Sequence, residues 1–158
     1  MAVIIVNIMN KELELIGIKK NNDYSLYTSP FVITHNKAII EAVKVIHNKF
    51  KRAYNTSDST WLYNKYNIFT LTAGSDYFYY IHQQIAAAVR DRIGHNRPLW
   101  VESWLNFHKE DEVLDWHFHD VNYIAHGYLS IDPKNTVTEF EQYTVENKIG
   151  NLYVGRSG

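Results

Sequence analysis

The sequence predicts an α+β fold in which helices from the first part of the chain pack on a β-sandwich or barrel formed by the last part. Two observations lead to this prediction. Before Pro98, apolar residues recur at three- and four-residue spacing in two stretches, as on one face of a helix. After Pro98, short stretches alternate between apolar and polar residues and are separated by turn residues, which is typical of strands.

The two helical stretches have recognisable ends. The first helix is expected to begin after Thr34, a candidate N-cap, and its apolar stripe extends to Phe50. The second is expected to begin at Ser75 and to stop at Gly94, because glycine readily adopts the left-handed conformation that ends many helices. Both helices therefore belong to residues 1–95, where they support the β-rich part of the chain.

Strands are expected on both sides of these helices. Several stretches are rich in β-branched and aromatic residues, or alternate in polarity, and most are bounded by turn residues. They are residues 3–8, 13–18, 66–72, 99–107, 127–131, 136–140 and 151–154. With 158 residues, the chain fits a single domain, 1–158, in which residues 96–158 form the β-rich core.

Composition excludes several classes of protein. Hydrophobic residues make up 46% of the chain, which excludes an intrinsically disordered protein. The formal net charge is −1 and no long run of lysine or arginine occurs, so neither a nucleic-acid partner nor a membrane partner is expected. A signal-peptide pattern and a bilayer-length apolar stretch are both missing, so a cytoplasmic protein is expected. Because cysteine is absent, a metal site must use histidine, aspartate or glutamate.

Histidines are concentrated in one short segment. Three of the eight histidines, His117, His119 and His126, fall within ten residues. On a strand, residues two apart point to the same face, so His117 and His119 are expected to project side by side while Phe118 points into the core. Two imidazoles on one strand can share an ion of iron, zinc, copper or nickel if a neighbouring strand supplies a third ligand.

The His-x-His spacing alone favours a metal site and a pair of structural histidines equally. The flanking Trp116 and Phe118 favour a partly buried strand, and buried imidazoles need partners. Asp120 is a ligand only if the strand bulges, because a regular pleat turns it away from the pair. His126 lies at an odd offset from His119, which places it on the other face, as a core residue or an outer support of the site rather than a ligand.

A cupin-like metalloenzyme is the first alternative. Cupin sites pair His-x-His with a glutamate four or five residues later, and Tyr123 and Ile124 occupy those positions here. The sequence also lacks a glycine-rich phosphate loop and a Gly-x-Ser-x-Gly element, which disfavours nucleotide binding and serine hydrolase chemistry.

Four motifs occur in an order that is similar to a family of 2-oxoglutarate/iron(II)-dependent oxygenases common in marine microbes and their phages. They are Ser103-Trp104-Leu105-Asn106, His117-Phe118-His119-Asp120, His126-Gly127-Tyr128-Leu129-Ser130 and Ile149-Gly150-Asn151-Leu152-Tyr153-Val154. The resemblance covers residues 100–158, and Leu129 stands where a second aromatic residue is usual.

The resemblance implies a double-stranded β-helix, or jelly roll, with the N-terminal helices packed on one sheet. It implies Fe(II) as cofactor and 2-oxoglutarate as co-substrate, in an oxygenase that hydroxylates a small molecule or a protein side chain. Carried over residue by residue, His117 takes the first metal position and His119 takes the place of the family's carboxylate. Trp104, Asn106 and Tyr128 are the residues expected to line the co-substrate pocket.

The chain departs from the family after His126. No further histidine follows, so the family's distal histidine and its basic 2-oxoglutarate-binding residue are expected beyond Gly158 in a C-terminally incomplete chain. Arg156 falls before the expected position. An incomplete barrel would leave an open sheet edge, through which a homodimer could form. The second alternative is therefore a non-catalytic jelly-roll module with a structural or assembly role.

Overall fold

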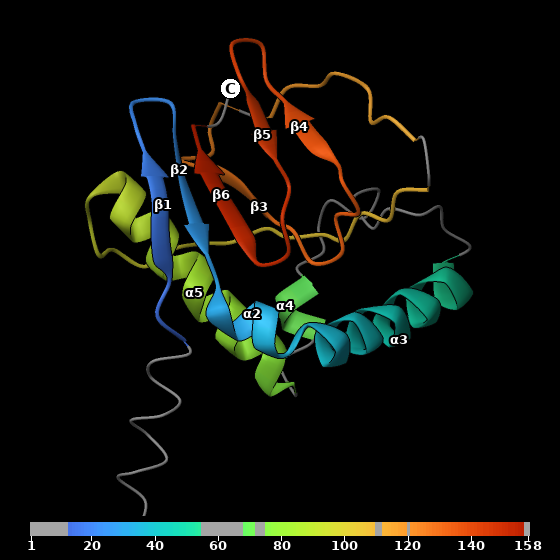
Figure 1. The fold of residues 1–158 in the computed structure, drawn as a ribbon. Coiled ribbons are helices and arrows are strands. Elements are labelled where there is room, and N and C mark those ends of the chain that lie inside the picture. Colours follow the sequence, from blue (N-terminus) through green and yellow to red (C-terminus); the bar gives the residue numbers. More distant parts are fainter. Residues whose placement is uncertain (1–12, 55–67, 72–74, 110–111, 120, 157–158) are drawn as a thin grey trace, which may run out of the picture.

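A computed structural model describes residues 13–54, 68–71, 75–109, 112–119 and 121–156. The strand expected over residues 3–8 lies outside this part of the chain. The described residues form an α+β fold with antiparallel sheets, which confirms the predicted class. Its helices are α2 (Pro30–Thr34), α3 (Asn36–Tyr54), α4 (Ile68–Leu71) and α5 (Asp76–Ile93). In Figure 1, α2, α3 and α4 lie below the strands, whereas α5 rises behind the sheet.

The main sheet brings the two ends of the described chain together. Its four strands are β1 (Ile16–Lys20), β2 (Tyr24–Thr28), β3 (His126–Leu129) and β6 (Asn151–Gly155), in the order β1-β2-β6-β3, and every pair is antiparallel. All five residues of β6 are buried, because the strand has neighbours on both sides. In this register, Tyr153 lies opposite Leu26 of β2 and Tyr128 of β3. The sheet does not close on itself, and β1 and β3 are its edges among the described strands.

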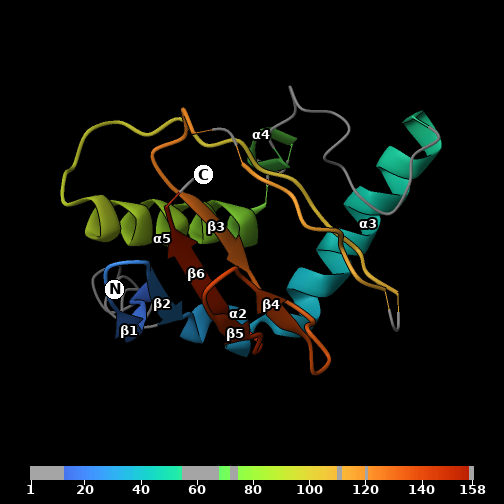
Figure 2. The same ribbon diagram turned by 90° about the horizontal axis from the view of Figure 1, so that it is seen from above.

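The two faces of this sheet are covered differently. On one face, Ala88 of α5 packs against Tyr27, Leu152 and Val154, and Figure 2 shows α5 running beside the sheet. The other face is covered by a second, two-stranded sheet of β4 (Val137–Glu139) and β5 (Thr144–Glu146). Val145 of this hairpin joins a cluster of aromatic rings that includes Tyr24, Phe140, Tyr143 and Tyr153.

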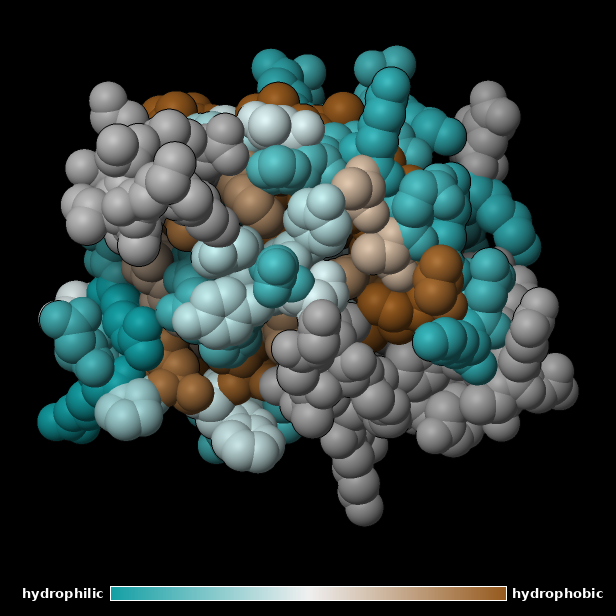
Figure 3. Space-filling view, turned by 90° about the horizontal axis from the view of Figure 1, so that it is seen from below, coloured by the Kyte–Doolittle hydropathy of each residue, from teal (hydrophilic) through white to brown (hydrophobic). Residues whose placement is uncertain are grey.

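The helices form their own core next to the sheet. Its buried residues come from α2, α3 and α5 and are Phe31, Val32, Ile39, Val43, Phe78 and Ile81. Seen from the helical side, hydrophobic residues appear as patches interrupted by hydrophilic ones (Figure 3). Among the described helices, none is long and apolar enough to cross a membrane.

The helix ends follow local chemistry. The first helical segment begins at Ser29, whose hydroxyl accepts a hydrogen bond from the Val32 amide at 3.0 Å, and Pro30 follows in the first turn. The helix predicted after Thr34 is α3, which begins at Asn36, so its start is confirmed. Thr34 is not its cap, however, because Thr34 is the last residue of α2 and a turn at His35 separates the two helices. The predicted stop at Gly94 is confirmed, with φ of 75° in the left-handed region.

Two predicted strands are not formed. Residues 68–71 are the helix α4, and residues 99–107 contain only isolated bridge residues at Ser103 and Asn106. A segment with a β-like pattern forms a strand only if a neighbouring strand satisfies its backbone hydrogen bonds. The expected neighbour of residues 99–107 was the segment 115–120, which forms no strand over its described residues. The strands β2 and β5 were not predicted, although the two tyrosines of β2 carry a strand signal.

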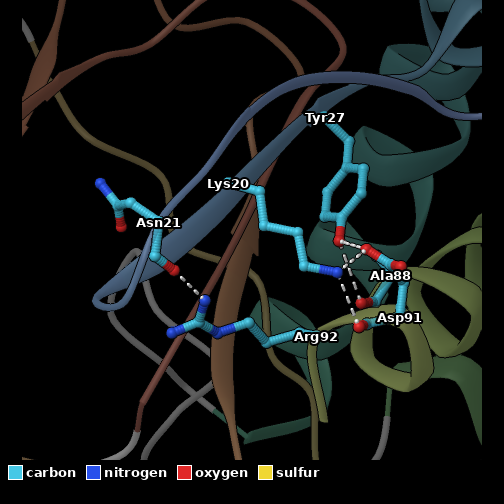
Figure 4. A network of polar contacts seen from close by, with 6 residues as sticks. All are labelled: Lys20, Asn21, Tyr27, Ala88, Asp91 and Arg92. Atoms are coloured by element: carbon cyan, nitrogen blue, oxygen red, sulfur yellow. Dashed lines mark hydrogen bonds and ion pairs between the residues drawn. The ribbon is translucent and has the colours of Figure 1, made fainter. Parts of the chain in front are cut away.

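A polar network joins the β1–β2 turn to the end of α5 (Figure 4). The Asp91 carboxylate accepts hydrogen bonds from the Tyr27 hydroxyl at 2.6 Å and from the Lys20 ammonium at 2.9 Å. The Arg92 guanidinium donates to the carbonyl of Asn21 at 2.5 Å. The hydrogen bond from Tyr27, followed by that from Lys20, holds the pKa of Asp91 below its usual value. Charge and hydrogen bonding therefore fix the hairpin on the helix.

Candidate metal centre

The candidate ligands lie on the segment that leads back to the sheet. Residues 95–125 run from the end of α5 to β3 without forming a helix or a strand in their described part (Figures 1 and 2). His117 and His119 lie on this segment, so the prediction that they belong to a regular strand is wrong. The neighbouring Phe118 is 95% exposed and Trp116 is 72% exposed, so the prediction that they make this segment part of the core is also wrong.

The predicted pairing of His117 and His119 does not depend on a strand. Their ring centroids are 5.1 Å apart and their planes meet at 74°. Two imidazoles that bind one ion through nitrogens about 2.1 Å from it have ring centroids roughly 4.5 to 5.2 Å apart. The centroid distance of the pair falls within this range.

One imidazole of the pair has a defined tautomer. Nδ1 of His117 lies 2.9 Å from the backbone carbonyl of Asp115, which can only accept a hydrogen bond, so Nδ1 carries the proton. The lone pair is then on Nε2, which is the form that binds a metal ion. Proteins commonly orient a metal-binding histidine by a hydrogen bond from its other ring nitrogen to a backbone carbonyl, as Asp115 provides here.

His126 is brought against the pair by a turn at residues 121–124. Its ring stacks on that of His119 with centroids 3.7 Å apart and planes inclined by only 22°. The offset argument that placed His126 on another face is therefore wrong, since it assumed an uninterrupted strand. Nearly parallel stacked rings cannot direct nitrogen lone pairs at one ion, because those lone pairs lie in the ring planes. In this arrangement, His126 packs on a candidate ligand.

Of the three expected pocket residues, Trp104 is the one placed at the histidines. Its ring lies 6.2 Å from that of His119, with planes inclined by 26°. The Asn106 side chain is exposed. The ring of Tyr128 stacks on Tyr153, with centroids 5.0 Å apart, and therefore belongs to the aromatic cluster under the β4–β5 hairpin.

The environment keeps two imidazoles neutral. Burial, and then the charge of His117, lower the pKa of His119. Burial, followed by the charges of His119 and His117, lowers the pKa of His126 to about 4. A histidine must be unprotonated to bind a metal, so His119 is held in its ligand form at neutral pH. Burial also raises the pKa of Tyr128 to about 12, which keeps its hydroxyl protonated.

The donor set is incomplete within the part of the chain that the structure describes. There, no three side chains of histidine, aspartate or glutamate are grouped so that they could hold a metal ion. Asp120, the proposed bulge ligand, lies outside the described residues. The described chemistry is therefore a two-imidazole site with a stacked third histidine and a tryptophan beside it.

The chain was compared with protein-family models, with curated proteins and with solved structures. No protein-family model matches the chain, and no curated protein or solved structure matches it either.

The stack of His126 on His119 could not be predicted from the linear spacing. The signal that was available is the turn-like run Asn122-Tyr123, which reverses the chain between the two histidines. The aromatic cluster was likewise missed, although twelve tyrosines in 158 residues indicate that aromatic packing shapes this fold.

Proposed function

We propose that this chain is an Fe(II)/2-oxoglutarate-dependent oxygenase that hydroxylates a small molecule or a protein side chain. The observation that carries the proposal is the inclined pair of His117 and His119, with ring centroids 5.1 Å apart. Support comes from the tautomer of His117 and the lowered pKa of His119, which both favour metal binding at neutral pH.

The proposed architecture is a double-stranded β-helix. In this interpretation, the four-stranded sheet and the β4–β5 hairpin are parts of the two facing layers of the jelly roll, and α5 supports the outer face of the larger sheet. The packing of Val145 on Tyr153 between the two sheets supports this interpretation, because a jelly roll buries its core between two antiparallel layers.

Two residues of the site have side-chain donors that suit a metal ion. Imidazole nitrogen suits Fe(II), and a bound iron would supply the chemistry that activates dioxygen. His117 and His119 would hold the ion through one nitrogen each. Trp104 and His126 lie against the His119 ring and keep water away from part of it, while the Asp115 carbonyl orients His117.

The fit to 2-oxoglutarate is weaker than the fit to a metal. Trp104 contacts a candidate ligand, whereas Asn106 is exposed and Tyr128 packs into the aromatic cluster. The co-substrate part of the proposal therefore depends on the family resemblance, and the metal part on the geometry.

The metal part is tested by titrating the purified, metal-free chain with Co(II) without oxygen and following its visible absorption. We expect the parent chain to bind one ion. His117→Ala and His119→Ala should each weaken binding by more than the roughly 10- to 100-fold typical of outer-shell changes. His95→Ala, in the loop after α5, is the matched control and should leave affinity unchanged. Equal affinity in all four proteins would contradict the proposed site.

The co-substrate part needs a separate measurement. Fe(II) and 2-oxoglutarate are added anaerobically, and the visible charge-transfer band of an iron–2-oxoglutarate chelate is recorded. Its appearance in the parent and its loss in His117→Ala support an oxygenase. Metal binding without any band would reject 2-oxoglutarate and favour the cupin-like metalloenzyme.

One observation favours a second candidate, the non-catalytic assembly module. Val113, Trp116 and Phe118 are more than 70% exposed beside the histidines, with values of 84%, 72% and 95%. Exposed apolar groups of this density often mark interaction sites. Absence of metal binding, together with self-association that Phe118→Ser reduces in sedimentation, would favour this module over the enzyme.

A further inference from the structure

The imidazole of His119 has one flat neighbour in close contact and a second nearby. His126 stacks on it at 3.7 Å with planes inclined by 22°, and Trp104 lies 6.2 Å away with planes inclined by 26°. Both neighbouring ring planes thus lie within 26° of the His119 plane. By contrast, the plane of His117 is inclined by 74° to that of His119. The orientation of His119 is therefore defined by its aromatic neighbours.

The position of His126 is itself well defined. It is the first residue of β3 and lies opposite Gly155 of β6, in a strand pair held by backbone hydrogen bonds. A side chain at Gly155 would collide with the Tyr153 ring, which shows that this ring fills the space above the glycine. Tyr153 is 2% exposed and lies 6.4 Å from the His126 ring. His126 is therefore a sheet residue with an ordered aromatic ring near it, whereas His119 lies on an irregular segment.

This contrast matters for metal binding. A histidine on an irregular segment loses side-chain and backbone freedom when it binds an ion, and that loss reduces its affinity. A neighbour that already fixes the ring removes part of the loss before the ion arrives.

We infer that His126 is a positioning residue, which holds the His119 ring in its ligand orientation by stacking from the edge of the sheet. This inference rests on the proposed metal site. It assigns His126 a role that needs a flat ring but no metal-binding nitrogen. The inference therefore makes opposite predictions for an aromatic and an aliphatic replacement.

The test compares His126→Phe with His126→Ala in the full chain by Co(II) titration. Phenylalanine keeps a flat ring and has no nitrogen, so we expect its affinity for Co(II) to stay within about threefold of the parent's. Alanine removes the ring, and affinity should fall by about 10-fold or more, as for other changes around metal ligands. The visible cobalt spectrum should keep its shape in His126→Phe and change in His126→Ala, since the His119 orientation differs. Far-ultraviolet circular dichroism checks that both variants fold.

Two results would overturn the inference. If His126→Phe loses Co(II) to the same extent as His119→Ala, then His126 is a ligand. If His126→Ala binds Co(II) as tightly as the parent and with the same spectrum, then the stack does not position His119.

A metal-free measurement separates this inference from the proposed function. In the apo protein, the ring of His126 should shift the nuclear magnetic resonance signals of the His119 ring protons. We expect this ring-current shift to disappear in His126→Ala and to persist in His126→Phe. If the parent chain binds no metal, the proposed function is contradicted. If the ring-current shift of His119 is unchanged in His126→Ala, the stacking of His126 on His119 is contradicted.

Discussion

Replacing Ser29 by alanine tests how the helical layer is joined to the sheet. Ser29 is 1% exposed and lies between β2 and α2. Its hydroxyl oxygen accepts a hydrogen bond from the Val32 amide at 3.0 Å, and its proton is donated to the Gln84 side-chain oxygen of α5 at 2.7 Å. Gln84 is also buried and donates to the carbonyl of Leu13 at 3.0 Å. One hydroxyl thus caps a helix and satisfies a buried amide.

The expected loss of stability has two parts. Removing a serine N-cap costs about 1 kcal/mol. The Gln84 oxygen is then left buried without its donor, which costs about 1 to 3 kcal/mol. We therefore expect Ser29→Ala to lower the free energy of unfolding by about 2 to 4 kcal/mol, a large share of the roughly 5 to 15 kcal/mol typical of a domain.

The assay is urea unfolding followed by tryptophan fluorescence and circular dichroism. The matched control is Ser75→Ala, because Ser75 occupies the N-cap of α5 without a side-chain capping hydrogen bond. It should cost no more than about 0.5 kcal/mol, as a surface substitution does. The dependence of the unfolding free energy on urea should be unchanged in both variants if only stability differs.

Equal losses in Ser29→Ala and Ser75→Ala would refute the reasoning, because the buried contact would then contribute nothing. A second variant examines the Gln84 part alone. Gln84→Leu should cost less in the Ser29→Ala background than in the parent, since the unpaired oxygen has already lost its donor there. Purely additive losses would contradict a direct interaction between the two side chains.

Three further predictions concern charge and aromatic packing. Asp91 has a lowered pKa in the folded chain, so its stabilising contribution is fully present above the usual carboxyl pKa and is lost as the pH falls through the lowered pKa of the folded state. Tyr27→Phe should therefore reduce the free energy of unfolding by about 0.5 to 1 kcal/mol at pH 7 and by less at pH 3, as measured by urea unfolding. Tyr153→Phe removes the 2.9 Å hydrogen bond between the hydroxyls of Tyr153 and Tyr143. It should lower the free energy of unfolding by about 1 kcal/mol in the same assay. A loss above about 3 kcal/mol would indicate that the whole aromatic cluster repacks. Because the pKa of His119 is lowered, this imidazole should stay unprotonated when the pH falls from 8 to the usual histidine pKa, and its protonation should not reduce the affinity for Co(II) over that range. A titration in which His119 itself protonates near the usual histidine pKa would contradict its burial.

The sequence determined the class of the fold and the position of its clearest elements. The apolar stripe of α5 and the glycine that ends it follow from local propensity and side-chain periodicity, which depend on residues close together in the chain. The same holds for β3 and β6, whose apolar and aromatic residues favour strands. The proximity of His117 and His119 is also local, since two residues in an extended segment remain close with or without a sheet.

Only the tertiary structure decided which strands formed. Residues 99–107 carry a strand pattern but have no continuous partner, whereas β2 found one in β6, far along the chain. Pairing of distant segments depends on the satisfaction of backbone hydrogen bonds across the whole sheet, and one strand's own residues do not encode it. The same reason explains why Phe118 is exposed although its residue type favours burial.

The site shows the same division between local pattern and three-dimensional arrangement. Spacing alone paired His117 with His119, and it placed His126 on the wrong face because the offset rule assumes a continuous strand. A turn reverses the chain between them, and pairing of β3 with β6 fixes His126 against the ring of His119. The sequence thus determined which imidazoles are available, and the fold determined which of them lie close together and which one stacks on a neighbour.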